Sequence, residues 1–178
     1  NQGLPAYDAI RTIRDLETFR PSFVEQPVKR HELAALAEIT RAFDFPIMAE
    51  ESVFDPRDAL LGAQDRIADI FSLKINKSGG LRRALEVAAI ARAAGIEVYG
   101  GCMFETSIAH AAGTHLMAAV PDLILGCEFY MSTYYAAEDI ATEPFPVRNG
   151  MVHVPTGPGL GIAPDPASLA RYRIALFD

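Results

Sequence analysis

Short apolar runs alternate with longer amphipathic stretches along this chain, at roughly 25 residues per pair. This rhythm indicates consecutive strand and helix units, in which the strands form a parallel sheet and the helices cover it. Strands are predicted at residues 22–26, 46–51, 68–75, 96–102 and 123–129. Helices are predicted at residues 5–19, at 30–44, from Asp55, from Leu81 to a stop at Gly95, and at 106–119.

Two α/β architectures fit such units, the (β/α)8 barrel and the open doubly wound sheet. The doubly wound sheet usually carries a glycine-rich phosphate loop, and Gly3-Leu4-Pro5 is not one. A whole barrel needs about 250 residues, whereas this chain has 178. We therefore expect residues 1–130 to be the C-terminal part of a barrel whose first strands precede Asn1.

Residues 131–178 differ in character from the rest of the chain, because prolines recur there and no further strand and helix unit is evident. Asn149-Gly150 between Val147 and Val154 is typical of a tight β-hairpin turn. We expect this segment to be a C-terminal wrap that contains a hairpin.

The charge balance excludes one broad class of partner. Sixteen Lys and Arg residues against 23 Asp and Glu residues give a formal net charge of −7, which disfavours general nucleic-acid binding. No apolar run is long enough to span a membrane, no signal peptide is evident at the start, and two cysteines are too few for a disulfide framework. These features predict a soluble, cytoplasmic protein.

Ionisable residues recur at the carboxyl ends of the predicted strands. Glu25, Glu50, Lys74 and Glu128 follow one another at steps of 25, 24 and 54 residues, the last step covering two units. Barrel enzymes build their active sites at this end of the strands. Carboxylate ligands favour Mg²⁺ or Mn²⁺ over zinc, and a lysine beside such a cation is suited to proton transfer. The pattern predicts a metal-dependent active site.

Five segments at these positions resemble the muconate cycloisomerase branch of the enolase superfamily, and the resemblance covers essentially the whole chain. The segments are Phe23-Val24-Glu25-Gln26-Pro27, Ile47-Met48-Ala49-Glu50-Glu51-Ser52, Leu73-Lys74-Ile75-Asn76-Lys77-Ser78-Gly79-Gly80, Gly100-Gly101-Cys102-Met103-Phe104-Glu105 and Gly126-Cys127-Glu128. The resemblance implies a modified (β/α)7β barrel and an N-terminal capping domain, toward which the C-terminal segment wraps back.

The resemblance also implies roles for individual residues. Glu25 matches the second metal ligand, Glu50 the third, Lys74 a lysine beside the substrate, and Glu128 an acidic residue on a late strand. The family usually has Asp where Glu50 stands, so Glu51 is an alternative or additional ligand. The first ligand and a Lys-x-Lys pair would lie upstream of Asn1, and whether that pair or Lys74 transfers the proton stays open.

The function implied is metal-dependent interconversion of cis,cis-muconate, or a substituted muconate, with muconolactone through an enolate, in aromatic-compound catabolism. The family likeness further implies Mg²⁺ or Mn²⁺ as cofactor, a small carboxylate substrate and a homo-oligomer. Dipeptide epimerases, N-acylamino-acid racemases and o-succinylbenzoate synthases of the same superfamily are the alternatives, and a non-catalytic barrel domain is a further one.

The remaining polar residues receive simpler interpretations. Cys102 and Cys127 are expected to be buried thiols, with Cys102 near the substrate, and Lys77 is expected at the surface or a helix start. Thr106 or Ser107 is expected to cap the following helix and to present its N-terminus to a substrate carboxylate. His110 and His115 lie five residues apart, which does not favour a shared metal on one helix face.

Overall fold

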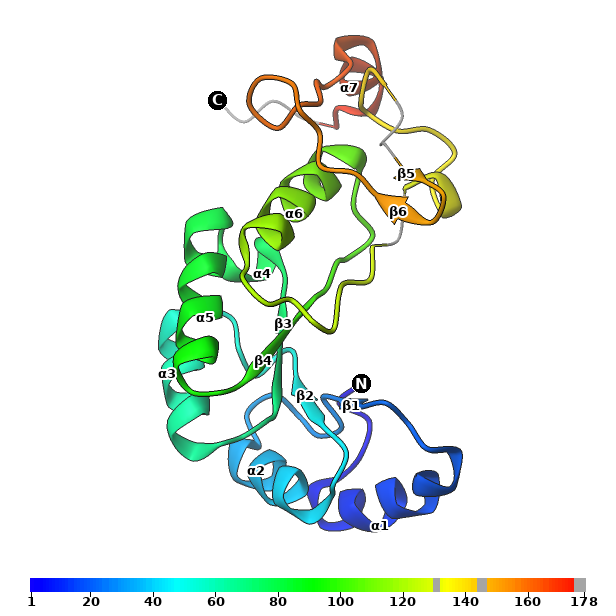
Figure 1. The fold of residues 1–178 in the computed structure, drawn as a ribbon. Helices are drawn as coiled ribbons and strands as arrows, with labels where there is room; N and C mark the ends of the chain where they lie inside the picture. Colours follow the sequence, from blue (N-terminus) through cyan, green and yellow to red (C-terminus); the bar gives the residue numbers. More distant parts are fainter. Residues whose placement is uncertain (130–131, 144–146, 175–178) are drawn as a thin grey trace. The chain divides into compact units, whose positions relative to one another are not determined.

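The structure is a computed structural model that describes residues 1–129, 132–143 and 147–174. Its main sheet has four strands in the order β1-β2-β3-β4 (Figure 1). Their bounds are Val24–Glu25, Ile47–Ala49, Ile70–Leu73 and Glu97–Gly100. Each lies inside a predicted strand, so the first four strand predictions are confirmed with shorter ends.

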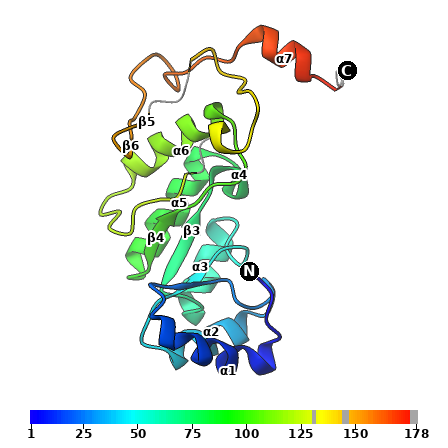
Figure 2. The ribbon, with the colours of Figure 1, turned by 90° about the vertical axis from the view of Figure 1, so that its right-hand side faces the viewer.

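The strands are parallel where their pairing is defined, β1 with β2 and β2 with β3. In a barrel, neighbouring strands follow one another in chain order. In a doubly wound sheet, the strand order reverses at one point across the sheet. Figure 2 shows β3 and β4 running side by side. The observed order therefore supports the barrel prediction over the doubly wound alternative.

Helices connect the strands and pack on one another in sequence, α1 on α2, α2 on α3 and α3 on α5. Phe71 of β3 faces this layer, because a methyl group at Gly62 of α3 would lie 3.3 Å from its ring. The helix bounds are α1 Ala6–Leu16, α2 Leu33–Ala42, α3 Pro56–Asp65, α4 Ile75–Ser78, α5 Leu81–Ala93, α6 Ser107–Ala119 and α7 Pro166–Tyr172, with short 3-10 turns at Glu17–Phe19 and Ser132–Tyr134.

Local sequence signals explain where several helices begin and end. The Asp55 side chain accepts hydrogen bonds from the backbone N–H groups of Arg57 and Asp58, and Pro56 occupies the first helical position. Asp165 and Pro166 repeat this arrangement at α7, a helix that the sequence analysis missed although the signal was present. Gly79 and Gly80 separate α4 from α5, with backbone φ values of +78° and +118° that favour glycine.

The predicted fifth strand at residues 123–129 is wrong. The described part of this segment contributes only one parallel bridge, between Gly100 and Cys127. The backbone leaves the extended conformation at Asp122 and Gly126, which have φ values of +57° and +74°, and residues 124–125 between them form a turn. Cys127 is exposed, against the prediction of a buried thiol, whereas Cys102 is buried as predicted.

Helix α6 is capped by a residue far along the chain. Thr106 occupies the predicted N-cap position, but its side chain makes no capping hydrogen bond. The Asp139 carboxylate instead accepts from the Ser107 backbone N–H at 3.1 Å and from the Ser107 hydroxyl at 2.6 Å. It also accepts from the Ser132 hydroxyl and the Ala141 N–H. These hydrogen bonds outweigh the opposing effect of burial and lower the pKa of Asp139.

The chain divides into two compact units, one of residues 1–99 and 123–126, the other of residues 100–122 and 127–178. The second unit contains the predicted hairpin, formed by β5 (Val147–Arg148) and β6 (Met151–Val152), with positive φ at Asn149 and Gly150. Within the described ranges, no helix combines the length and the apolar character needed to cross a bilayer. The boundary expected at residue 130 stays a prediction.

Candidate active site

The carboxyl ends of β1, β2 and β3 bring three of the predicted site residues onto one face of the sheet. Met48 is in register with Glu25 on one side and with Ile70 on the other. Because side chains alternate along a strand, Glu50 shares the face of Met48, and Lys74 shares the face of Ile70. Glu25, Glu50 and Lys74 therefore project from neighbouring strand ends on the same side, as the spacing predicted.

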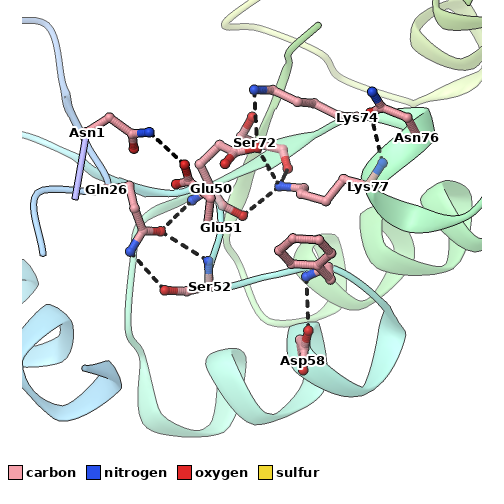
Figure 3. Close-up of polar contacts among 11 residues, drawn as sticks. Asn1, Gln26, Glu50, Glu51, Ser52, Asp58, Ser72, Lys74, Asn76 and Lys77 are labelled. Carbon is pink, nitrogen blue, oxygen red and sulfur yellow. Dashed lines mark hydrogen bonds and ion pairs between the residues drawn. The ribbon is translucent and has the colours of Figure 1, made fainter. Parts of the chain in front are cut away.

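Glu50 lies between two ammonium groups. Its Oε1 atom is 3.2 Å from Lys74 Nζ and 3.2 Å from Lys77 Nζ (Figure 3). All three side chains are buried, with exposed fractions of 7% for Glu50, 11% for Lys74 and 6% for Lys77. Burial alone would raise the pKa of Glu50, but attraction by Lys77, a side-chain hydrogen bond with Glu51 and the contact with Lys74 together outweigh it and lower that pKa. Glu50 is thus held as a carboxylate.

Lys77 lies in the short helix α4, which agrees with the expected helix start, but its side chain is buried, so the alternative of a surface lysine is wrong. Its ammonium group donates hydrogen bonds to the backbone carbonyls of Glu50 at 2.6 Å and Ser72 at 2.9 Å, in addition to its ion pair. The short helix α4 follows β3 directly after Lys74, and this single turn brings Lys77 back over the strand ends. Burial lowers the pKa of Lys77, while the attraction of Glu50 opposes that shift.

Gln26 is a second residue that the sequence reasoning did not assign to the site. It is fully buried, and its Oε1 atom accepts from the backbone N–H groups of Glu50 at 2.9 Å and Ser52 at 3.2 Å. Its amide nitrogen donates to the Val28 carbonyl and the Ser52 hydroxyl. The only sequence signal was its place after Glu25 in the first family-like segment. Gln26 fixes the end of β1 against the end of β2.

Glu51 points toward the N-terminal residue of the chain. Its Oε1 atom accepts a hydrogen bond of 2.6 Å from the Asn1 side-chain amide (Figure 3). Its Oε2 atom is buried and makes no hydrogen bond within the described part of the chain. A buried carboxylate oxygen without a donor is costly unless a cation satisfies it. Glu51 therefore has an oxygen that could bind a cation next to Glu50. This is compatible with the sequence-based alternative of Glu51 as an additional ligand.

The other predicted site residues lie in the second unit. Glu128 follows the bridge between Cys127 and Gly100, and its backbone N–H donates to the Gly100 carbonyl at 2.9 Å. This places Glu128 beside the carboxyl end of β4. Cys102 lies two residues beyond the same strand end, and Thr106 and Ser107 begin α6. Both Ser107 donor groups are engaged by Asp139.

Comparison with known proteins connects this geometry to one family. The family model described as Enolase C-terminal domain-like matches residues 1–168. The chain is 38% identical over 173 residues to Muconate cycloisomerase 1-2 of Acinetobacter lwoffii, covering 97% of this chain and 45% of that protein. It is 37% identical over 172 residues to Chloromuconate cycloisomerase CbnB of Cupriavidus necator, covering 97% of this chain and 46% of that protein.

Solved structures give the same result. The crystal structure of a muconate cycloisomerase from Azorhizobium caulinodans superposes with a TM-score of 0.86 at 47% identity, covering 96% of this chain and 48% of that one. The chain spans about half the length of the curated relatives it matches. The four strands of the main sheet and their helices are therefore part of an enolase-type C-terminal barrel domain.

Replacing Lys77 with Met tests how far the strand ends depend on this ammonium group. The change leaves two buried carbonyls without the Lys77 donor and removes one of the two ammonium groups that contact Glu50. We expect the free energy of unfolding to fall by about 3 kcal/mol, the lower end for breaking a buried pair, since Lys74 stays beside Glu50.

Urea denaturation of the intact protein measures this loss, and Lys29→Met, at an exposed lysine, is the matched control. A Lys77→Met variant as stable as the Lys29→Met variant would show that the buried ammonium group does not hold the strand ends.

Proposed function

The chain belongs to the enolase C-terminal domain-like family, and from that premise we propose that it carries much of the active site of a metal-dependent muconate cycloisomerase. The observation that carries the proposal is the buried Glu50 carboxylate between Lys74 and Lys77 at the strand ends. The likeness to muconate and chloromuconate cycloisomerases over nearly the whole chain supports it. The proposed reaction interconverts cis,cis-muconate, or a chlorinated muconate, with its lactone.

The donor atoms at the strand ends fit a hard divalent cation. Glu25 and Glu50 present carboxylates on one face of the sheet, and Glu51 adds a buried oxygen that accepts no hydrogen bond from the residues that the structure describes. An all-oxygen set of this kind is suited to Mg²⁺ or Mn²⁺. We propose Glu25 and Glu50 as ligands, with Glu51 as a further oxygen donor. The bound cation would stabilise negative charge that develops on the substrate carboxylate.

Lys74 is the proposed proton carrier for the reaction. In the lactone-forming direction, one carboxylate oxygen of muconate bonds to a carbon of the distant double bond, and a proton is added α to the other carboxylate. Lys74 supplies that proton and recovers one from solvent, and in the reverse direction it removes the same proton. Lys77 is less suited to this role, because its donors already bind Glu50 and Ser72.

The second unit supplies the remaining proposed contacts. Glu128, beside the end of β4, is proposed to orient the substrate or to carry a proton. Cys102 is proposed to line the substrate region from the same strand end. Thr106 and Ser107 are proposed to face a substrate carboxylate at the start of α6, although Asp139 now holds both Ser107 donors. For Ser107, this role requires the Asp139 carboxylate to release the Ser107 N–H and hydroxyl.

The substrate is tested by assaying the intact protein with Mn²⁺ and each candidate compound. We expect the ultraviolet absorbance of cis,cis-muconate or a chloromuconate to fall as the conjugated diene is consumed. L-Ala-D/L-Glu is the matched alternative, and exchange of its α-proton in deuterated solvent is followed by NMR. Exchange of the dipeptide without any turnover of either muconate would overturn the proposed reaction in favour of epimerisation.

The proposed ligands are tested by Mn²⁺ binding, which does not require turnover. Glu25→Gln and Glu50→Gln should each weaken binding by at least about tenfold, because each removes a charged oxygen donor. The Mn²⁺ electron paramagnetic resonance signal measures free ion during titration. Glu51→Gln reports whether the neighbouring carboxylate contributes, and Glu38→Gln, at an exposed glutamate of α2, is the control. Unaltered binding in both ligand variants would refute the site.

Lys74 is tested by its replacement with Ala. We expect kcat for the muconate reaction to fall by at least about 100-fold, since general acid catalysis contributes at that level. The fold should persist, because Lys77 still accompanies the Glu50 carboxylate. A variant that turns over at a near-normal rate would assign the proton transfer to another group.

A further inference from the structure

Three potential metal-binding side chains gather at the end of β4, within the second unit. Cys102 lies two residues beyond the strand, Glu105 lies two residues before α6, and His110 lies in the first turns of α6. One donor atom from each, the Cys102 Sγ, a Glu105 carboxylate oxygen and a His110 ring nitrogen, lies within 4.8 Å of the other two. Cys102 and His110 are buried, with 4% and 0% of their surfaces exposed, and Glu105 is half-buried.

The donor types differ from those proposed at Glu25 and Glu50. Sulfur and nitrogen donors suit zinc-like cations, whereas Mg²⁺ and Mn²⁺ favour oxygen. Zinc bonds of about 2.0–2.3 Å place tetrahedral donors roughly 3.5 Å apart. Donors that already lie within 4.8 Å of one another need only approach by about an ångström.

The charge distribution around these residues also suits a cation. The N-terminus of a helix is positively polarised and by itself would repel an ion. Asp139 offsets this effect, because its carboxylate binds the first N–H and the hydroxyl of α6 at Ser107. Burial lowers the pKa of His110, although Asp139 opposes the shift, and the neutral imidazole is the form that binds metals.

We propose that Cys102, Glu105 and His110 form a second cation site, selective for zinc-like ions over Mg²⁺ and Mn²⁺. The three side chains supply sulfur, oxygen and nitrogen, and the half-buried Glu105 leaves a fourth position for water. The sequence did not predict this site, because the spacing Cys-x2-Glu-x4-His matches no common zinc motif. The inference stands independently of the muconate reaction.

Cobalt absorption tests the site in the intact protein. Co²⁺ is added in the presence of excess Mg²⁺, and coordination by sulfur produces a thiolate-to-cobalt charge-transfer band in the near ultraviolet. The oxygen donors of Glu25 and Glu50 cannot give this band. We expect one equivalent of Co²⁺ to produce it and Zn²⁺ to abolish it.

Variants identify the donors. Cys102→Ser should remove the band, and Glu105→Gln and His110→Gln should each weaken Co²⁺ binding by at least about tenfold. Cys127→Ser removes the other, exposed cysteine and should leave the band unchanged. Circular dichroism confirms that each variant is folded, and if Cys102→Ser does not fold, Glu105→Gln and His110→Gln still decide the result.

Two outcomes would overturn the proposal. The first is the absence of a charge-transfer band in the wild-type protein at several equivalents of Co²⁺. The second is a band that persists in folded Cys102→Ser or, with undiminished affinity, in both the Glu105→Gln and His110→Gln variants.

Loss of muconate turnover in the Glu25→Gln or Glu50→Gln variants, with the charge-transfer band retained, would support two separate cation sites.

Discussion

The buried ammonium group of Lys77 holds the candidate site together. It donates hydrogen bonds to the backbone carbonyls of Glu50 and Ser72 and forms an ion pair with the Glu50 carboxylate. This one group therefore connects the ends of β2 and β3 and contacts the Glu50 side chain. Gln26 completes the arrangement from the other side through the Glu50 N–H. Glu50 is therefore fixed through its N–H, its carbonyl and its side chain, which is the rigidity that the proposed metal ligand and the proposed proton carrier beside it would require.

Two lysines three residues apart, Lys74 and Lys77, contact Glu50 in different ways. Lys77 is occupied by backbone carbonyls, so its ammonium group serves to position Glu50. Lys74 contacts the same carboxylate oxygen from the end of β3. The net charge of −7 is compatible with a site that binds a carboxylate substrate. The electric field at the strand ends is set mainly by the nearby charges, such as those of Lys74 and Lys77.

The second unit shows how contacts distant in sequence decide local chemistry. The sequence predicted a helix start at Thr106 and Ser107, yet the cap comes from Asp139, more than thirty residues away. The same carboxylate lies close enough to His110 to influence its pKa. From the sequence, Cys102 was expected near the substrate, His110 was not expected to share a metal with His115, and Glu105 had no predicted role. The chain between β4 and the first turn of α6 brings these three side chains together in the folded protein.

The sequence alone determined the succession of strands and helices and placed Glu25, Glu50 and Lys74 at the strand ends. It could do so because hydrophobic periodicity fixes which face a residue takes in a regular element. It failed at residues 123–129, where backbone turns at Asp122 and Gly126 interrupt an apolar run. The tertiary structure decided that Lys77 is buried, that Gln26 locks the strand ends and that Asp139 caps α6. These depend on packing between separate segments, which a one-dimensional pattern does not encode.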